Sequence, residues 1–200
     1  MMESYIKPNL WLIFLLYGGI VLILPTYRVW KQTGVNPLTF GNTDSAHDYA
    51  GRVFKVLMGL LLGTILVYCF TDWYGWLTPI RWLERPMFGI TGIALVTLSL
   101  LWIMLAQHHM RQSWRIGIDD AHPAPLVTTG IFAYSRNPVF LGMLVGIGGL
   151  FLVLPNAVTL GLLGVGYVIM QLQVRLEEEF LERQYGDAYR AYKTRTRRWF

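Results

Sequence analysis

The sequence predicts an all-α integral membrane protein: a polytopic bundle of about five transmembrane helices followed by a C-terminal amphipathic helix in the cytoplasm. Of its 200 residues, 54% are hydrophobic and only 14% are charged. The apolar residues fall in long runs, whereas in a soluble domain they would be spread more evenly. Aromatic residues gather near the ends of these runs, where amphipathic rings favour the lipid headgroup zone.

Three apolar runs occupy the first half of the chain. The first span is predicted over residues 9–24, ending near Pro25, and is expected to be retained because no signal-peptide pattern precedes it. Turn-forming residues then predict a loop over residues 33–49. The second span is predicted over residues 53–70. The third, residues 86–106, is uncharged and long enough to cross roughly 30 Å of hydrocarbon.

A polar segment over residues 107–136 separates these spans from two further ones. The fourth and fifth spans are predicted over residues 138–154 and 157–172, and the short connection between them forces a tight antiparallel hairpin. Both spans are rich in glycine, which lets helix backbones approach closely in lipid. Apolar residues at near-helical spacing over residues 173–200 predict an amphipathic helix on the membrane surface.

The distribution of basic residues predicts the orientation in the membrane. With five spans, fourteen of the 17 Lys and Arg residues fall on one side and three on the other. The positive-inside rule therefore places the C-terminus and the polar segment in the cytoplasm, and the N-terminus outside. We accordingly divide the chain into residues 1–106, the first three spans, and residues 107–200, which hold the candidate site.

Several classes of partner and chemistry are not expected. The basic residues from Arg175 onward predict a contact with anionic membrane lipids rather than nucleic acid, because charges beside a span usually report topology. The three histidines His108, His109 and His122 fit no established metal-ligand spacing, so no metal site is expected. The single cysteine, Cys69, allows no intramolecular disulfide, and no arrangement for covalent catalysis stands out.

Two groups of polar residues flank the apolar hairpin on the predicted cytoplasmic side. The first is Arg136-Asn137-Pro138, where the proline suits the first turn of a helix. The free backbone N–H groups of that turn, together with Arg136, form a seat for a carboxylate or a hydroxyl group. The alternative is that Arg136 anchors the topology and Asn137 is an ordinary helix N-cap.

The second group is the run of three glutamates at residues 177–179. These side chains repel one another and lie at the C-terminal end of a span, where the helix dipole favours cations, so they need partners. Glu177 lies one turn after Gln173 and is expected to face back toward the bundle. The alternative is a solvated acidic face that Arg175 and Arg183 neutralise.

Three stretches of this half of the chain share features with a known family. They are Leu126-Val127-Thr-Thr-Gly130-Ile-Phe132, then Arg136-Asn137-Pro138-Val-Phe140-Leu-Gly142, and finally Glu177-Glu178 with Leu181, Tyr185-Gly186, Tyr189 and Tyr192. Together with Ser113-Trp114-Arg115, they resemble the small integral-membrane methyltransferases typified by isoprenylcysteine carboxyl methyltransferase, which include the phospholipid methyltransferases. The similarity covers the chain from Ser113 onward, and the first spans carry no family signature.

The resemblance implies a cytoplasm-facing pocket for S-adenosylmethionine. Arg136 is expected at the carboxylate of the substrate or cofactor, and His122 or Glu178 is a candidate general base. Aromatic faces such as that of Tyr134 are expected to stabilise the cationic sulfonium group. Together with Tyr134, the residues expected around the cofactor are Leu126, Val127, Gly130, Phe132, Asn137, Pro138, Val139, Phe140 and Glu177.

Departures from the family pattern leave the methyl acceptor open. Asn137 stands where prenylcysteine enzymes usually have His, phenylalanines replace two tyrosines, and Gln173 occupies the place of an Arg linked there to the substrate carboxylate. The expected acceptor is therefore a lipophilic carboxylate, amine or thiol that enters from the bilayer. Methyl transfer to it needs alignment near 3 Å and exclusion of water, but no metal.

Two other functions remain as alternatives. An NADPH-dependent membrane reductase of the sterol-reductase type needs a basic cluster for the cofactor phosphate, and Arg111 and Arg115 are few for that task. A non-enzymatic membrane subunit, such as one that delivers heme, needs axial histidines inside spans, whereas His108 and His109 lie at the end of one. The oligomeric state is left open.

Overall fold

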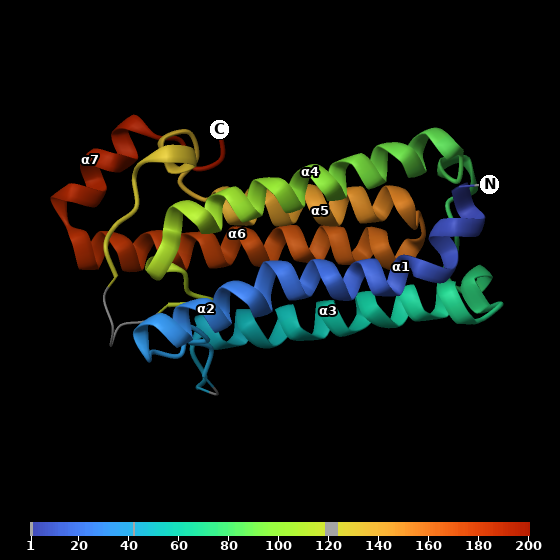
Figure 1. Ribbon diagram of the computed structural model, residues 1–200, viewed down its shortest axis with the longest axis horizontal. Helices are drawn as coiled ribbons and strands as arrows, with labels where there is room; N and C mark the ends of the chain where they lie inside the picture. Colours follow the sequence, from blue (N-terminus) through green and yellow to red (C-terminus); the bar gives the residue numbers. More distant parts are fainter. Residues whose placement is uncertain (1, 42, 119–123) are drawn as a thin grey trace.

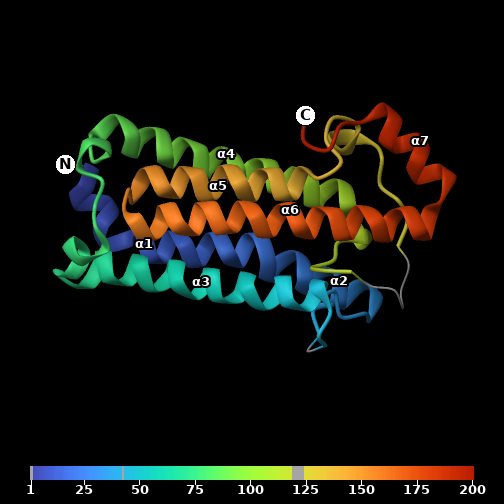
Figure 2. The same cartoon turned by 180° about the vertical axis from the view of Figure 1, so that it is seen from behind.

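A computed structural model describes residues 2–41, 43–118 and 124–200, which fold into a bundle of long helices. The helices that run along its long axis are α1 (Met2–Gly18), α3 (Ala46–Phe70), α4 (Pro86–Met110), α5 (Pro138–Val153) and α6 (Ala157–Tyr185) (Figure 1). Seen from both sides, α6 lies between the α1–α3 pair and the α4–α5 pair (Figure 2). The last helix, α7 (Asp187–Arg195), lies at the end of the bundle away from the N-terminus.

The helices have the length and composition of membrane spans. Among the described residues, four helical segments are long and apolar enough to cross a membrane, namely Lys7–Thr33, Ala46–Phe70, Pro86–Ser113 and Ala157–Tyr185. The helix α5 is shorter and apolar, and it packs along α4. The prediction of an all-α membrane protein with about five apolar spans is therefore confirmed.

The first span is longer than predicted and does not end at Pro25. A π-helical turn, η1 (Gly19–Ile23), joins α1 to α2 (Leu24–Thr33). Proline cannot donate to the carbonyl four residues before it, and in a regular helix its ring clashes there. The wider π-helical turn relieves this conflict, and the Val21 carbonyl instead accepts a hydrogen bond from Gln107 Nε2 of α4 at 2.6 Å.

The segment between α2 and α3 is hydrogen-bonded to the segment that follows α4. It ends four residues earlier than predicted, because Ser45 Oγ accepts from the Asp48 N–H and caps α3, which starts at Ala46. The Thr39 N–H donates to the Ile116 carbonyl at 3.1 Å, and the Ile116 N–H donates to the Pro37 carbonyl at 2.8 Å. This pairing holds residues 37–41 against residues 116–118.

Glycine permits the tightest helix contact, which is between α4 and α5. A methyl group on Gly92 would lie 2.5 Å from the Gly149 carbonyl oxygen, and one on Gly149 would lie 2.8 Å from the Gly92 oxygen. The predicted close approach of a glycine-lined fourth span is thus confirmed. The hairpin to α6 is also confirmed, and Asn156 and Thr159 form a reciprocal capping box at its start.

The prediction of one amphipathic helix over residues 173–200 is wrong. The fifth span continues without a break to Tyr185, and the chain turns at Gly186, whose φ of +51° favours glycine. After α7, residues 196–200 lead back to the start of α5. We call residues 193–198, whose contacts are described below, the C-terminal strap.

Candidate active site

The start of α5 is built by a short turn and a proline. Residues 130–133 form a 3-10 turn, and Gly130 has a φ of +64° and lies so close to the His109 ring that a methyl group there would overlap it. Pro138 then occupies the first helical turn. The buried Asn137 side chain does not cap this helix. Its Nδ2 instead donates to Glu178 Oε1 at 3.2 Å, so the ordinary N-cap alternative does not hold.

A buried ion pair joins α5 to α6. Glu178 is only 5% exposed, and its Oε1 lies 2.9 Å from Arg136 NH2. Its Oε2 lies 2.8 Å from Arg198 NH2. The hydrogen bond to Glu178 raises the pKa of Arg198, so this guanidinium stays charged. Both oxygens of Glu178 are therefore engaged.

The C-terminal strap completes the hydrogen bonding of this region. Arg136 NH1 donates to the carbonyls of Lys193 and Thr196, at 3.3 and 2.5 Å. The Arg136 N–H donates to the Arg197 carbonyl at 3.0 Å. Tyr192 Oη of α7 donates to the Phe132 carbonyl at 2.6 Å, and burial raises the pKa of Tyr192 to about 12, so the hydroxyl keeps its proton.

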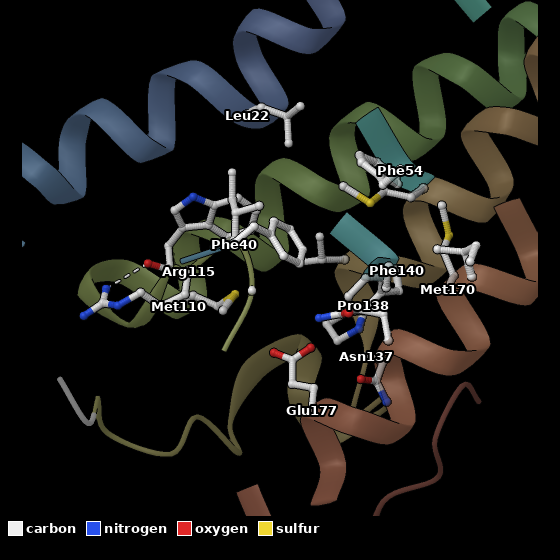
Figure 3. Close-up of a pocket in the computed structure, with 18 of the residues that line it drawn as sticks. Leu22, Phe40, Phe54, Met110, Arg115, Asn137, Pro138, Phe140, Met170 and Glu177 are labelled. Atoms are coloured by element: carbon white, nitrogen blue, oxygen red, sulfur yellow. Dashed lines mark hydrogen bonds between the residues drawn. The ribbon is translucent and has the colours of Figure 1, made fainter. Parts of the chain in front are cut away.

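Glu177 differs from its neighbour in direction and in partners. Successive residues of a helix are rotated by about 100°, so Glu177 points away from the ion pair and into a cavity (Figure 3). No described residue forms a hydrogen bond or an ion pair with it. Its carboxylate is therefore available to a ligand.

Two cavities meet at Glu177. The inner cavity, of about 110 Å³, reaches toward the bundle and is lined by apolar residues of η1, α3, α5 and α6. The outer cavity, of about 120 Å³, lies beneath α7 and the segment after residue 124. Both are lined by the same seven residues: Met110, Arg115, Gly117, Phe132, Arg136, Asn137 and Glu177. This shared wall is the partition between them.

Most of the residues expected at the cofactor line one of these cavities. Leu126 and Val127 line the outer cavity, and Phe132, Asn137 and Glu177 lie in the partition. The inner cavity is lined by Pro138, Val139 and Phe140. Gly130 and Tyr134 line neither cavity, and Tyr134 is 72% exposed.

The candidates for acid–base roles are placed differently. Arg136 lines the partition, but most of its guanidinium N–H groups already donate hydrogen bonds to Glu178 and to carbonyls of the C-terminal strap. Glu178 has both oxygens engaged, which does not favour a role as a base. The other candidate base, His122, lies outside the described residues.

Sequence reasoning missed the contribution of the first half of the chain. Phe40, Ala50 and Phe54 line the inner cavity, and His47 stacks on Phe40 with ring centroids 4.6 Å apart. The pairing with Ile116 and the contact of α3 with α6 bring these residues to the site. The signal of the paired segment in the sequence is a run of turn formers. Residues from both sides of the predicted division at residue 106 therefore line the inner cavity.

The fold and the site define a polytopic membrane protein with two adjoining cavities, and an unpartnered carboxylate between them, at one end of the described spans. A model of the phospholipid methyltransferase family, PEMT, matches residues 85–188, and the chain belongs to this family. Members are S-adenosylmethionine-dependent methyltransferases, so the protein is a membrane methyltransferase with that cofactor, and a lipid acceptor is implied. Among curated proteins, none matches the sequence closely.

Proposed function

We propose that the protein methylates a lipophilic acceptor that reaches the inner cavity from the bilayer, while the cofactor occupies the outer cavity. The observation that carries this proposal is the position of Glu177. Its carboxylate lies in the partition, has no partner among the described residues, and is flanked by apolar and aromatic side chains. A carboxylate in such a place suits the ammonium or ribose groups of S-adenosylmethionine.

The residues around the outer cavity fit this cofactor. Leu126, Val127 and Phe132 offer apolar and aromatic contacts for an adenosyl group, and Glu177 offers the charge. When bound, S-adenosylmethionine supplies a methyl group already activated by its sulfonium. The protein then has to align the acceptor with this methyl group and exclude water, and the aromatic face of Phe132 favours a nearby cation by about 0.5–2 kcal/mol.

The acceptor has an apolar route from the membrane. A groove of about 710 Å³ between α2 and α3 shares Leu22, Phe40, Phe54 and Ile116 with the inner cavity. A second apolar cavity, of about 310 Å³, continues from the inner cavity into the middle of the bundle. Hydrocarbon is favoured in such spaces over water by roughly 0.8 kcal/mol for each buried CH₂ group, which supports an acceptor with an alkyl tail.

The roles of the acidic residues follow from their contacts. Glu178 holds Arg136 and Asn137 in place, so it positions the partition and does not take a proton from the acceptor. An acceptor amine or thiol that needs deprotonation leaves His122 as the candidate base.

The test is binding of S-adenosylmethionine to the purified protein in detergent. We expect saturable binding by the wild type and at least a 10-fold weaker affinity for Glu177→Gln, because one charge-assisted hydrogen bond contributes about 1.5–3 kcal/mol. The matched control is Glu179→Gln, since Glu179 is 66% exposed and pairs only with Arg183 among the described residues. Equal affinities of the two variants would remove Glu177 from the cofactor site. Absence of wild-type binding would refute the proposal.

A further inference from the structure

A separate cleft lies between α2 and the end of α4, outside the two cavities that share Glu177. It has a volume of about 810 Å³, and its walls come from one face of α2, the last turn of α4 and the 3-10 turn η4 (Arg111–Ser113). Two hydrogen bonds join these walls. Gln107 donates to the Val21 carbonyl, and Trp114 Nε1 donates to Thr26 Oγ1 at 3.4 Å. The shape of the cleft is therefore set by contacts between distant parts of the chain.

Basic side chains from both walls meet in this cleft. Arg28 of α2 lines it together with His108 and Arg111, and none of the three lines either cavity at Glu177. Among the described residues, no Asp or Glu lines the cleft, and none forms a hydrogen bond or an ion pair with these three side chains. We call this feature the basic cleft. Two guanidinium groups without a carboxylate partner in the described chain favour the binding of an anion there.

The backbone at Arg111 is unfavourable for a residue with a side chain. Its φ is +50°, a conformation that type II′ turns usually give to glycine. Strained positions of this kind are concentrated at ligand-binding and active sites. Arg111 therefore brings a charged group to the basic cleft from a position where the backbone itself favours glycine.

The basic cleft continues into apolar surface toward the middle of the bundle. Ile20 lies eight residues before Arg28, and Met104 lies seven residues before Arg111, so both apolar residues lie roughly 10–12 Å deeper along the helices. Leu24 also lines the cleft, and both it and Met104 are exposed. Cations at the ends of the spans, followed by exposed apolar surface, match the headgroup and the adjoining acyl chains of a membrane lipid.

We propose that the basic cleft binds the phosphate of an anionic phospholipid from the surrounding membrane, with Arg28 and Arg111 donating to its oxygens. A guanidinium group can donate two parallel hydrogen bonds to a phosphate. A lipid whose headgroup also carries an ammonium group is disfavoured, because no described carboxylate lines the cleft to receive that charge. The bound lipid bridges α2 and η4. It is distinct from the methyl acceptor, which is proposed to reach the inner cavity, so the inference does not rest on the proposed function.

Phospholipids with the same short acyl chains provide the test. Dissociation constants are measured for dioctanoyl phosphatidylglycerol and dioctanoyl phosphatidylcholine, each titrated into the full-length protein in the same neutral detergent at one ionic strength. We expect the wild type to bind the anionic lipid about 10-fold more tightly. Glycerophosphoglycerol, the same headgroup without acyl chains, is expected to bind at least about 10-fold more weakly than phosphatidylglycerol, because it lacks the apolar contacts.

Variants locate the binding. Arg28→Gln is expected to reduce the preference for the anionic lipid to about two-fold or less. Lys31→Gln is the matched control, because Lys31 is exposed on the same helix, loses the same charge and does not line the cleft. Arg111→Gly is expected to weaken binding in the same way, while its Tm in detergent equals or exceeds that of the wild type, since glycine relieves the backbone strain. A loss of binding in this variant is then not a result of unfolding.

Three results would overturn the inference. They are equal wild-type binding of the two lipids, the same lipid preference in Arg28→Gln as in Lys31→Gln, and binding of glycerophosphoglycerol as tight as that of phosphatidylglycerol. The second result would mean that the charge of this membrane face acts without a defined site, and the third that the cleft takes a free phosphate ester. S-adenosylmethionine binding, measured on the same samples, reports separately on the proposed function.

Discussion

Adjacent glutamates of one motif have opposite environments. Glu178 is buried between Arg136 and Arg198, whereas Glu177 faces the two cavities without a partner among the described residues. The helical rotation of about 100° between neighbours explains this division. The two adjacent glutamates therefore combine a residue that holds the start of α5 with a residue that faces the cavities.

The ion pair between Arg136 and Glu178 is expected to contribute mainly to the stability of the fold, and only indirectly to catalysis. Replacing Arg136 by Ala leaves a buried carboxylate with one partner fewer, and breaking such a pair destabilises a protein by about 3–5 kcal/mol. We expect a clear fall in the Tm of Arg136→Ala, measured by intrinsic fluorescence in detergent. Arg198→Ala is expected to have a smaller effect, since its side chain is 34% exposed and water can replace it.

Arg195→Ala is the control for this series. Arg195 is exposed, and its guanidinium Nε donates to the Ala191 carbonyl of its own helix. Its removal is expected to change the free energy of unfolding by no more than about 0.5 kcal/mol. A Tm of Arg136→Ala equal to that of Arg195→Ala would contradict the structural role of the pair.

At the level of helices, the α4–α5 contact sets the position of the site. Trp102 Nε1 of α4 donates to the Pro138 carbonyl at 2.9 Å, and the Gly142 backbone lies against the Ile103 side chain. The first turn of α5 is therefore held against α4 while its polar residues reach α6. A change in the distance between α4 and α5 is therefore expected to shift Arg136 and Asn137, which directly precede α5 and belong to the partition.

Neighbouring glycines of α5 give a sharp test of this packing. Gly149→Ala places a methyl group 2.8 Å from the Gly92 carbonyl oxygen, whereas around Gly148 there is no atom within 4 Å among the described residues. Overpacking is unfavourable by about 1–3 kcal/mol, so Gly149→Ala should lower the Tm in detergent. Gly148→Ala should leave it unchanged or raise it, because alanine favours a helix. The reverse order would refute the close contact between the α4 and α5 backbones.

For the molecule as a whole, the two cavities that share Glu177 and most basic residues lie at one end. The partition, α7 and the C-terminal strap share this end with the segment between α2 and α3 (Figure 1). The positive-inside rule assigns it to the cytoplasm. A cytoplasmic site is also open to a water-soluble cofactor such as S-adenosylmethionine, which is consistent with the proposed orientation.

Cysteine labelling tests this orientation. In a Cys69→Ser background, Glu84→Cys and Thr194→Cys each place one thiol at an exposed position, at opposite ends of the bundle. An impermeant maleimide applied to intact cells should label Glu84→Cys directly and Thr194→Cys only after permeabilisation. The opposite pattern would place the site outside the cell.

Local sequence patterns are sufficient to predict the spans and much of the site. Apolar runs predict the helices, and Pro138 and the glycines predict the start and packing of α5. They are not sufficient where a distant group decides the outcome. The continuation through Pro25 depends on the hydrogen bond that Gln107 donates to the Val21 carbonyl, and the position of His47 depends on its pairing with residue 118.

The C-terminal strap has a consequence for how variation in this protein should be interpreted. It supports the Arg136-Asn137 motif largely with main-chain carbonyls, those of Lys193, Thr196, Arg197 and Arg198. Most substitutions preserve a carbonyl, so side-chain identity at Lys193 or Arg197 is a poor guide to importance, and a scan of single substitutions there would underrate the segment. The family match ends at residue 188, so these four carbonyls, unlike Glu178, lie beyond the stretch by which the family is recognised.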